Sequence, residues 1–469
     1  MVNSILQKLI ELAKNINERA KSGEITDLDL MAASVLADCK AASSEIIELI
    51  IEEMNRGLRE DKAFRREHGL VIKQKDRPRS LLTALGPIDF KRDYYYDKNT
   101  GKHRAILDPI LGIERYERIG GEVGAALVNQ AADCSYAKAA QIVTGGAVSR
   151  QTVRTQLLKA HVPEAAPRVR GKGVPCLHVY ADEDHVHMQK PNKERGKCNR
   201  VVPLVTVTEG TSPVSERRNK TINPMHFSDG DLDPKAVWKS VEGYIEQAYN
   251  VEAVEKIYVH GDGGNWISKG LECFAQTVHA MDGYHFYKAL RGVSKILPKR
   301  NIRVALINAL KHNDRDRADE YIQDLLNSPL SEKERKQIMS FATYLFGSWE
   351  DIMHRVVDDI PGSCTEAQIS HVLSERLSRD PLGWSKEGLG QIVQARVYLE
   401  NGGRLEKKDM RAPEEGTETY SQYADHFIEE YVKGACDFSI FEREEPILNG
   451  ASATQILLGK IGRPRSLLA

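Results

Sequence analysis

The sequence "HVYADEDHVHM", residues 178–188, puts three acidic side chains directly after an apolar run. That run, "VPCLHVYA", predicts a buried β-strand over residues 176–182. Asp182, Glu183 and Asp184 then stand where the strand is expected to end. A carboxylate at the end of a buried strand loses hydration and needs a compensating partner. A basic side chain, a metal ion and water are the candidates.

Strand and helix patterns alternate along the chain from this point. After the first strand come strands over 201–208 and 222–227, a helix beginning near Asp233, a strand ending at Gly261, a helix from about Trp266, a short strand in "TVHAMD" and a helix from Tyr284. Three meandering strands followed by α/β crossovers predict a mixed sheet with helices on its faces. The expected fold class is therefore α/β.

A second acid of interest lies in "YVHGDGGNWI", where Asp262 follows an apolar strand at once and glycines flank it. A carboxylate on a turn without bulky neighbours, at the carboxyl end of a strand, can approach a ligand closely. Taken alone, an ordinary Asp-Gly turn is the better interpretation of Asp262.

A third acid is Glu366, near the start of a helix that Thr365 is expected to cap. The helical period puts Glu366 on the face of Leu373 and Leu377, the face expected to pack on the sheet. The helix dipole favours a negative charge there. Glu375 points to the opposite side and is expected to be solvated. Taken alone, Glu366 is an ordinary first-turn acid.

Together the three acids favour a different interpretation. In an RNase H-like fold, the ends of the first strand, of the next α/β strand and of a later helix converge, which would bring Asp182, Asp262 and Glu366 to one place. Three carboxylates that close raise each other's pKa unless cations lie between them. Mg²⁺ or Mn²⁺ suits such oxygen ligands, and a pair of ions can clamp both oxygens of a phosphoryl displacement. The predicted partner of Asp182 is therefore a divalent metal.

Composition narrows the class of protein. The chain has 469 residues, 41% hydrophobic and 28% charged, which is enough for two to four soluble domains. No apolar run reaches the ~18 residues that would span a membrane. Seven scattered cysteines without a CxxC pair favour a reducing cytoplasm over disulfides or a zinc knuckle. The net charge of −1 argues against a protein that coats nucleic acid.

Two segments nevertheless carry features of DNA binding. Residues 134–160 have helix–turn–helix spacing: Ser135 can cap a first helix, Gly145 and Gly146 supply the turn, and Ser149 can cap a second helix. The candidate base-reading residues on the second helix are Arg150, Gln151 and Arg154. The basic stretch 56–104 supplies the candidate phosphate contacts Arg77, Arg79, Lys91 and Arg92. A packing role for the helix pair and a merely solvated surface for the basic stretch are the alternatives.

The rest of the chain divides by pattern. Residues 290–360 are charged and wholly helical, which predicts a helical insertion whose basic residues line a DNA path, or which serves stability or dimer contact. The expected regions are an N-terminal helical and basic β region, 1–110; a helix–turn–helix region with linker, 111–170; the first part of a catalytic core, 171–290; the insertion, 291–362; the last core helix, 363–400; and a tail, 401–469.

The motifs "YADEDHVH", "YVHGDGGNWI", "MDGYHFYKAL" and "CTEAQISHVLSERLSRDPLGWS" resemble those of bacterial insertion-sequence transposases of the DDE type. The resemblance is to the Mutator-like group of the RNase H-like, retroviral-integrase superfamily, whose members were formerly grouped as an uncharacterised protein family. Mutator-like enzymes carry a D-x-x-H element after the second Asp, and Asp282 and His285 match it.

The resemblance implies a DNA transposase that cuts at inverted repeats and joins the freed 3′-hydroxyls to target DNA. Its catalytic and metal-binding carboxylates would be Asp182, Asp262 and Glu366, with Asp282 and His285 in support. Strand alternation puts Asp184 on the side of Asp182, so Asp184 is a supporting ligand or the true one. His185 and His187 are expected to be exposed strand residues, and His285 by itself is an ordinary structural histidine.

The expected partner is double-stranded DNA, at the element's ends and at the target, with no membrane. A homo-oligomer on DNA and a cytoplasmic, nucleoid-associated location are also expected. Two other functions stay open: an RNase H-fold nuclease or resolvase without strand transfer, and a non-catalytic helix–turn–helix DNA-binding protein.

Overall fold

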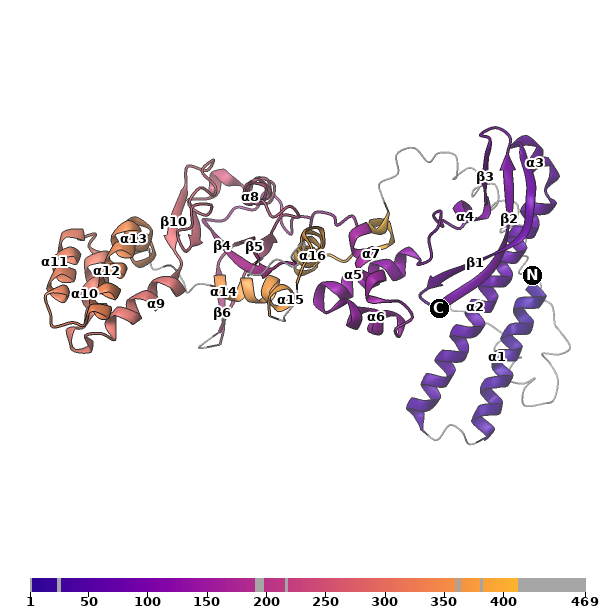
Figure 1. The fold of residues 1–469 in the computed structure, drawn as a ribbon, viewed down its shortest axis with the longest axis horizontal. Helices are drawn as coiled ribbons and strands as arrows, with labels where there is room; N and C mark the ends of the chain where they lie inside the picture. The colour runs from indigo at the N-terminus through magenta and orange to yellow at the C-terminus, as the bar shows by residue number, and fades with distance from the viewer. Residues whose placement is uncertain are drawn as a thin grey trace, which may run out of the picture. The chain divides into compact units, whose positions relative to one another are not determined.

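The structure is a computed structural model, and two compact units make up the chain (Figure 1). The residues that it describes are 2–22, 27–189, 198–215, 218–358, 360, 364–379 and 383–411. The first unit contains Met1–Val123 and the second is Gly124–Ala412. The C-terminal tail predicted from residue 401 lies outside the described residues from 412 onward.

The first unit is helical and then β, as its sequence pattern predicts. Its helices are α1 (Val2–Ser22), α2 (Leu28–Glu60), α3 (Lys62–Glu67) and the short α4 (Leu107–Ile110). An antiparallel sheet in the order β1-β2-β3 consists of β1 (Leu70–Thr83), β2 (Gly86–Asp97) and β3 (Lys102–Arg104). A core that includes Leu58, Phe90 and Tyr95 joins the end of α2 to this sheet.

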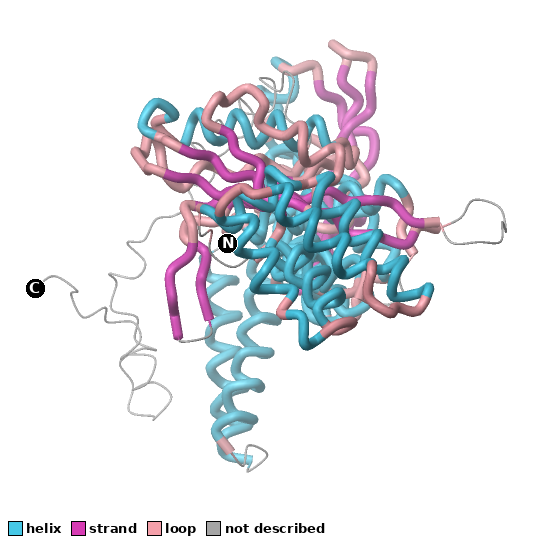
Figure 2. The backbone as a smooth tube through the Cα atoms, turned by 90° about the vertical axis from the view of Figure 1, so that its left-hand side faces the viewer, coloured by secondary structure: helices cyan, strands magenta, loops and turns pink. Residues whose placement is uncertain are grey.

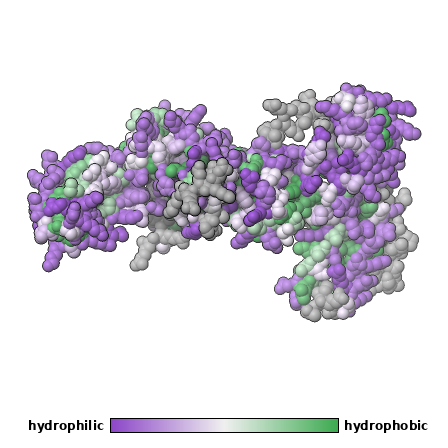
Figure 3. Space-filling view, viewed as in Figure 1, coloured by the Kyte–Doolittle hydropathy of each residue, from purple (hydrophilic) through white to green (hydrophobic). Residues whose placement is uncertain are grey.

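Helices α1 and α2 pack against each other and leave apolar side chains in solvent. Ion pairs link them, with Lys8 Nζ 2.8 Å from a Glu45 oxygen and Arg19 Nη1 3.2 Å from an Asp38 oxygen. Leu28 on α2 is 77% exposed, and Figure 3 shows apolar residues on the visible face of this helix pair. The pair is therefore held partly by charge.

The second unit is built on a five-stranded mixed sheet in the order β10-β9-β4-β5-β8. The strands are β4 (Cys176–His187), β5 (Asn199–Thr208), β8 (Met225–Phe227), β9 (Lys256–Gly261) and β10 (Thr277–Met281). Strands β4, β5 and β8 form an antiparallel meander, while β9 and β10 run parallel to β4. This α/β sheet agrees with the prediction, and a small hairpin, β6 (Thr211–Ser215) with β7 (Arg218–Thr221), was not foreseen.

Strand β4 is longer than its sequence suggests. Its pairing with β5 continues from His178 to His187, and the two strands run out together as an arm in Figure 2. Its parallel pairing with β9 ends earlier, at Tyr180 opposite His260. The three acids therefore lie inside β4 and not after it, because the antiparallel partner keeps the strand extended where the parallel partner has ended.

The helix expected from Trp266 is wrong, because turns occupy this stretch between β9 and β10. The Trp266 carbonyl accepts a hydrogen bond from Trp238 Nε1 at 2.9 Å and so has a partner outside any helix. The ring of Trp238 also lies so close to Gly270 that an added Cβ there would come within 2.3 Å of it. Glycine-rich turns fit against this indole more closely than a helix with side chains could.

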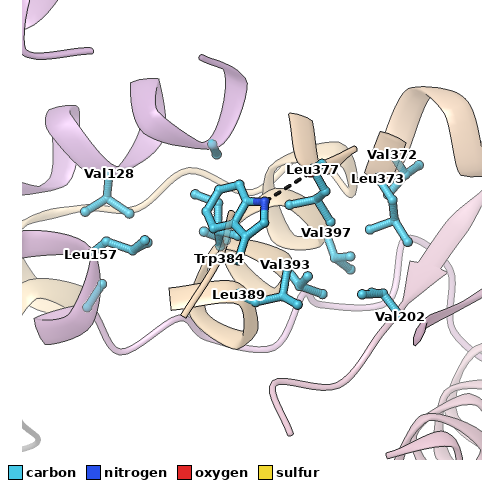
Figure 4. Packing of buried hydrophobic residues seen from close by; sticks show 14 of the residues in the cluster. Val128, Leu157, Val202, Val372, Leu373, Leu377, Trp384, Leu389, Val393 and Val397 are labelled. Atoms are coloured by element: carbon cyan, nitrogen blue, oxygen red, sulfur yellow. Dashed lines mark hydrogen bonds between the residues drawn. The ribbon is translucent and has the colours of Figure 1, made fainter. Parts of the chain in front are cut away.

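Helices cover both faces of the sheet. On one face, α8 (Pro234–Ala248), which Asp233 caps as expected, packs on residues such as Val179 and Val259. On the other face, a core around Trp384 joins the sheet to the segment after the insertion and to α16 (Lys386–Glu400) (Figure 4). The Trp384 Nε1 donates to the Leu377 carbonyl at 3.0 Å, which fixes the indole at the centre of this core.

The helix–turn–helix prediction is confirmed in its local geometry. The helices are α5 (Gly121–Asp133), α6 (Tyr136–Thr144) and α7 (Arg150–Lys159). Ser135 and Ser149 cap α6 and α7 by accepting from backbone N–H groups, and Gly145 ends α6 with a left-handed φ of 62°. Leu157 of α7 is fully buried in the Trp384 core, so the pair has a packing role whatever else it does.

The predicted insertion, 291–362, is helical through the residues described there, but the helical unit begins earlier, because α9 (Gly283–Ser294), which the sequence pattern assigned to the catalytic core, shares its hydrophobic core. The unit also contains α10 (Ile302–Lys311), α11 (Arg315–Leu326), α12 (Glu332–Gly347) and α13 (Trp349–Val357). These helices share a core of their own that includes Leu310, Ile322 and Leu345. The chain then returns to the sheet through α14 (Thr365–Gln368), a π-helical turn η3 (Ile369–Ser374) and α15 (Glu375–Leu377).

The separate core of the insertion can be tested on α12. Leu345 is fully buried there, whereas Met339 on the same helix is 54% exposed. Leu345→Ala should lower the free energy of unfolding of the insertion by ~2–5 kcal/mol, because it removes transfer energy and leaves a cavity. Met339→Ala should change it by less than ~0.5 kcal/mol. Hydrogen exchange should accelerate in α9–α13 for Leu345→Ala, and equal acceleration in β4 and β5 would contradict a separate core.

Candidate active site

Three carboxylates lie just beyond the point where the parallel pairing of β4, β9 and β10 ends. Tyr180 pairs with His260, so Asp182 and Asp262 lie two residues further along adjacent strands. Asp282 directly follows β10, and its backbone N–H donates to the Gly261 carbonyl at 2.7 Å. The sheet thus brings Asp182 and Asp262 to one edge, where the sequence predicts them.

Asp182 is held in an unfavourable electrostatic environment. Burial is the largest cause that raises its pKa to about 6, and the negative charges of Asp262 and Glu366 contribute to the same rise. A hydrogen bond from the Glu183 backbone N–H, at 2.8 Å, and the nearby His285 oppose this effect. Asp182 therefore carries most of the electrostatic strain at this place, and the charges of Asp262 and Glu366 add to it.

Glu366 differs from its prediction in orientation. Its side chain is 54% exposed and lies with Oε1 at 3.9 Å from His285 Nε2, not against the apolar face of the sheet. The expected face assumed a continuous α-helix, but η3 widens the helix after four residues and shifts the angular phase between Glu366 and Leu373. Glu375 is exposed as predicted, and Arg379 donates to it at 3.2 Å.

Thr365 does not cap the helix either. Cys364 occupies the capping position without a side-chain cap hydrogen bond. The Thr365 hydroxyl is instead buried and donates to Asp282 Oδ1 at 2.9 Å. The sequence pattern suggested a local cap, whereas the hydroxyl reaches a carboxylate 83 residues away in the chain.

The D-x-x-H pair forms the second part of the site. Asp282 is 1% exposed and caps α9, where Oδ2 accepts from the His285 backbone N–H at 3.2 Å. The ring Nδ1 of His285 also lies 3.2 Å from Oδ2. This hydrogen bond to Asp282 raises the pKa of His285, and the charges of Asp182 and Asp262 add to the effect. His285 thus stands between Asp282 and Glu366 as a group that favours the protonated form.

The acids beside Asp182 point to opposite faces, as strand alternation predicts. Asp184 is buried and accepts from Ser378 Oγ at 2.9 and 3.1 Å, which links β4 to the segment after α15. Glu183 accepts from Trp266 Nε1 at 2.8 Å on the other face. His185 and His187 are exposed, as expected. Asp184 therefore has a structural partner already.

The oxygen ligands in this site are of the kind that Mg²⁺ and Mn²⁺ prefer, but their positions do not form a complete metal site. Asp182, Asp262 and Glu366 offer hard carboxylate oxygens whose mutual repulsion a cation would relieve. Throughout the described ranges, however, no three His, Cys, Asp or Glu side chains stand ready to hold a metal ion. Glu366 faces His285 instead of completing a set with the two aspartates.

A buried polar stack below the carboxylates was missed from the sequence. His178 Nδ1 lies 3.0 Å from His260 Nε2, and the Tyr180 ring stacks on His260 with centroids 4.5 Å apart. Burial lowers the pKa of His178 to about 4, so this imidazole is neutral near pH 7. The signal was present, because β4 reads His-x-Tyr-x-Asp and β9 reads Tyr-x-His-x-Asp, with the polar side chains on alternate residues.

The candidate DNA-binding residues separate into two groups. Arg150 and Gln151 are exposed at the start of α7, and Arg154 is partly exposed one turn later. In the first unit, Lys91 is exposed, and the Arg77 guanidinium lies 4.8 Å from the centroid of the Tyr94 ring. These residues remain open to a ligand.

Two of the predicted phosphate contacts have internal roles instead. Arg92 is 8% exposed, with Nε 2.8 Å from Asp108 Oδ1. Arg79 Nη1 lies 3.5 Å from Asp108 Oδ2, and its Nη2 donates to the Glu117 carbonyl at 2.8 Å. A buried carboxylate needs such positive partners. Arg79 and Arg92 are therefore not DNA-binding candidates, because a phosphate contact would leave Asp108 buried without them.

Fold and site together define an α/β protein with an acidic site where its parallel strands end. A family model described as "Uncharacterised protein family (UPF0236)" matches residues 23–414, and the chain belongs to this family. A UPF0236 protein of Caldanaerobacter subterraneus subsp. tengcongensis is 33% identical over 407 residues, covering 86% of this chain and 81% of its own. Another from the same organism is 34% identical and covers 77% and 76%.

The name of the first of these relatives joins eleven gene loci of one genome, so the family has many copies there. Among solved structures, a Drosophila P element transposase strand transfer complex matches with a TM-score of 0.18 and 11% identity, covering 72% of this chain and 92% of that one. A similarity this low carries no argument. No helix in the described part of the chain is long and apolar enough to cross a membrane.

The raised pKa of Asp182 predicts how stability depends on pH. The folded-state pKa of about 6 exceeds the ordinary 3.8, so the folded protein binds this proton more tightly than the unfolded chain does. The ionised carboxylate therefore costs stability above pH ~6 and nothing below pH ~4. Without divalent cations, Asp182→Asn should raise the free energy of unfolding at pH 8 by ~1–2 kcal/mol, after allowance for solvent screening.

Denaturant unfolding at pH 8 and pH 4 measures this difference. Glu320→Gln, at an exposed position on α11, is the matched control and should change neither value. An Asp182→Asn protein that is less stable than wild type at pH 8 would contradict the electrostatic strain.

Proposed function

We propose that this protein is a DDE-type DNA transposase that cleaves the ends of an insertion sequence and joins them to target DNA. The observation that carries this proposal is that Asp182 and Asp262 lie two residues beyond the paired Tyr180 and His260 on adjacent parallel strands, where the charges of Asp262 and Glu366 act on Asp182. Clustered carboxylates that are not all paired with basic side chains are typical of sites that bind divalent cations for phosphoryl transfer.

The topology supports an RNase H-like fold. The first strand of the meander, β4, is central, with β5 and β8 on one side and the parallel β9 and β10 on the other. In this order Asp182 lies on β4 and Asp262 directly follows the adjacent β9, while Glu366 belongs to a helix. The turns that replace a helix between β9 and β10 depart from the expected pattern.

In this proposal Asp182, Asp262 and Glu366 would hold Mg²⁺ or Mn²⁺, which supplies charge stabilisation at the attacking and leaving oxygens of the phosphodiester. Asp282 orients His285 through Oδ2. His285 favours the protonated form and lies beside the carboxylates, so it can donate a hydrogen bond to a phosphate oxygen. The neutral His178–His260 stack packs under the site without adding charge.

The proposed DNA surfaces are those that remain exposed. Arg150 and Gln151 lie at the start of a capped helix, as base reading requires. The insertion exposes the predicted Lys295, Lys299, Arg303 and Lys311, whereas Arg300 Nη1 donates to Asp324 at 3.0 Å. A DNA path along the insertion is therefore a smaller basic surface than the sequence suggests, and its own core supports a stability role equally well.

The family supports a mobile element. A relative encoded at eleven loci of one genome is expected of a gene that copies itself to new positions. We also propose that the protein acts as a homo-oligomer on DNA, in the cytoplasm and on the nucleoid, because joining two element ends needs two sites at once.

A nuclease or resolvase of the same fold is the second candidate, because the acidic site would serve hydrolysis equally. Strand transfer separates the two: a transposase joins a 3′-hydroxyl end to a second duplex, whereas a nuclease only cuts. A purely DNA-binding role would leave the clustered carboxylates without a purpose, and their electrostatic cost argues against it.

The carboxylates can be tested singly. Asp182→Asn, Asp262→Asn and Glu366→Gln should each reduce Mg²⁺-dependent cleavage of element-end DNA by at least ~10³-fold, because each removes a ligand charge. DNA affinity in EDTA should stay within about twofold, since none of the three binds DNA without metal. Glu375→Gln, nine residues from Glu366 and exposed, is the control and should keep full activity. Full cleavage by Glu366→Gln would remove Glu366 from the site.

The DNA contacts can be sorted by salt dependence. Arg77→Ala or Lys91→Ala should weaken binding on all sequences and lower the slope of log K against log salt by about one. Arg150→Ala and Gln151→Ala should cost ~1–3 kcal/mol on the element end and little on random DNA. Lys159→Ala, at the exposed far end of α7, should leave sequence preference unchanged. Fluorescence anisotropy over a salt series gives both quantities, and equal losses on both DNAs for Gln151→Ala would refute base reading.

A further inference from the structure

The outer face of the sheet in the first unit carries a row of aromatic side chains. Tyr94 and Tyr96 alternate with Tyr95 along β2, and Tyr95 is 1% exposed in the core that α2 shares. Strand alternation therefore puts Tyr94 and Tyr96 on the opposite face. There the ring centroid of His103, on β3, lies 6.0 Å from that of Tyr94 and 5.1 Å from that of Tyr96. The three rings form one continuous surface, which we call the aromatic row.

Each tyrosine of the aromatic row has a basic side chain beside its ring. Lys73 Nζ lies 5.5 Å from the ring centroid of Tyr96, and the Arg77 guanidinium lies 4.8 Å from that of Tyr94. Both cations and His103 are exposed, whereas the two tyrosines are half-buried. A planar guanidinium stacks on flat rings and also binds phosphate, so Arg77 suits both kinds of contact. The row thus combines aromatic surface and positive charge at one place.

The charge around the aromatic row suits a phosphate backbone. Three of the four acids on β1, β2 and β3, which are Asp76, Asp93 and Asp97, pair with Arg59 or Arg104. The exposed basic side chains on these strands and on the turn between β2 and β3 are Lys73, Lys75, Arg77, Lys91, Lys98 and Lys102. Because most of the acids here have partners inside the protein, these cations give the sheet a positive surface on a chain whose net charge is only −1.

The direction of Arg77 depends on an irregular part of β1. The pairing of β1 with β2 shifts register between Gln74 and Arg77, and Asp76 there has a left-handed φ of 54°. The Asp76 backbone N–H donates at 3.0 Å to Oδ1 of Asp93, whose side chain is fully buried. A β-bulge redirects the side chains next to it, and strained backbone persists only where its surroundings hold it. The buried carboxylate of Asp93 therefore fixes the bulge after which Arg77 lies beside Tyr94.

We propose that the aromatic row binds single-stranded DNA, with bases stacked on its rings and phosphates held by Lys73 and Arg77. The base faces of a duplex lie inside its own stack, so a duplex can use the cations but not the rings. Every unpaired base, by contrast, has a face that can stack on an aromatic ring. The inference rests on the proposed function for the source of the strand, an unpaired stretch at an element end. It requires neither a metal ion nor cleavage, so binding alone can test it.

The experiment measures binding of the full chain, in EDTA, to a fluorescent oligothymidylate and to a duplex of equal length. Tyr94→Leu removes the ring and should weaken binding to the single strand by about 5- to 150-fold, the usual loss for one base-stacking ring. It should weaken binding to the duplex by less than about twofold, because paired bases cannot reach the ring. Tyr94→Phe keeps the ring and should bind the single strand like wild type.

Tyr116→Leu is the matched control for the loss of an exposed tyrosine. Tyr116 is 77% exposed and has the Arg115 guanidinium 4.8 Å from its ring centroid, but it lies outside the sheet. Its replacement should leave binding to the single strand unchanged. An oligothymidylate that carries 5-iodouracil should crosslink under ultraviolet light to a peptide containing Tyr94, Tyr96 or His103. Crosslinks found only outside residues 70–104 would overturn the inference.

The remaining outcomes separate this inference from the proposed function. Equal losses on single strand and duplex for Tyr94→Leu would overturn it, because the ring would then only support a phosphate contact of Arg77. Equal losses in Tyr94→Phe and Tyr94→Leu would overturn it too, and tighter binding of an RNA strand of matching sequence would make RNA the partner. Should Tyr94→Leu not fold, Tyr96→Leu takes its place in the same measurements. A protein that binds the single strand as expected but never cleaves or joins DNA would refute the transposase and leave the aromatic row in place.

Discussion

The parallel pairing of β4 with β9 and of β9 with β10 is the constraint on which the site depends. Where adjacent parallel strands stop pairing at similar levels, the residues that follow lie close together, whatever their charge. Here those residues include Asp182, Asp262 and Asp282, and burial together with the charges of Asp262 and Glu366 raises the pKa of Asp182 to about 6. The cores on both sheet faces must outweigh this repulsion for the fold to persist.

The environment of Asp282 differs from those of Asp182 and Glu366. Its carboxylate is almost fully buried, caps a helix and accepts from Thr365, so its charge is satisfied within the protein. Asp182 and Glu366 keep part of their surface open, and no described lysine or arginine bonds to them in the hydrogen bonds and ion pairs found. One acid of the cluster thus serves structure, while the others stay free for a ligand.

The helical insertion leaves the sheet and returns to it at the same residue. The chain leaves the sheet after β10, builds a five-helix unit around its own core, and returns at Thr365 to the same Asp282 from which it departed. The hydrogen bond between Thr365 and Asp282 therefore closes the loop at the site itself. A large insertion can be tolerated there because the two ends of the excursion are bonded to each other.

The sequence by itself determined most of the strand and helix order, the helix–turn–helix caps at Ser135 and Ser149, the helical character of the insertion, and that Asp182 and Asp262 follow the apolar parts of two strands. These follow from local periodicity and capping, which depend on neighbours in the chain. It did not foresee the length of β4, the turns after Trp266, the partner of Thr365, or the burial of Arg79 and Arg92 around Asp108. Only the tertiary structure decided these, because each depends on a residue far away in sequence. Pairing with β5 extends β4, and Trp238 packs where a helix was expected. Asp282 accepts a hydrogen bond from Thr365, and the buried Asp108 pairs with two arginines that would otherwise face solvent.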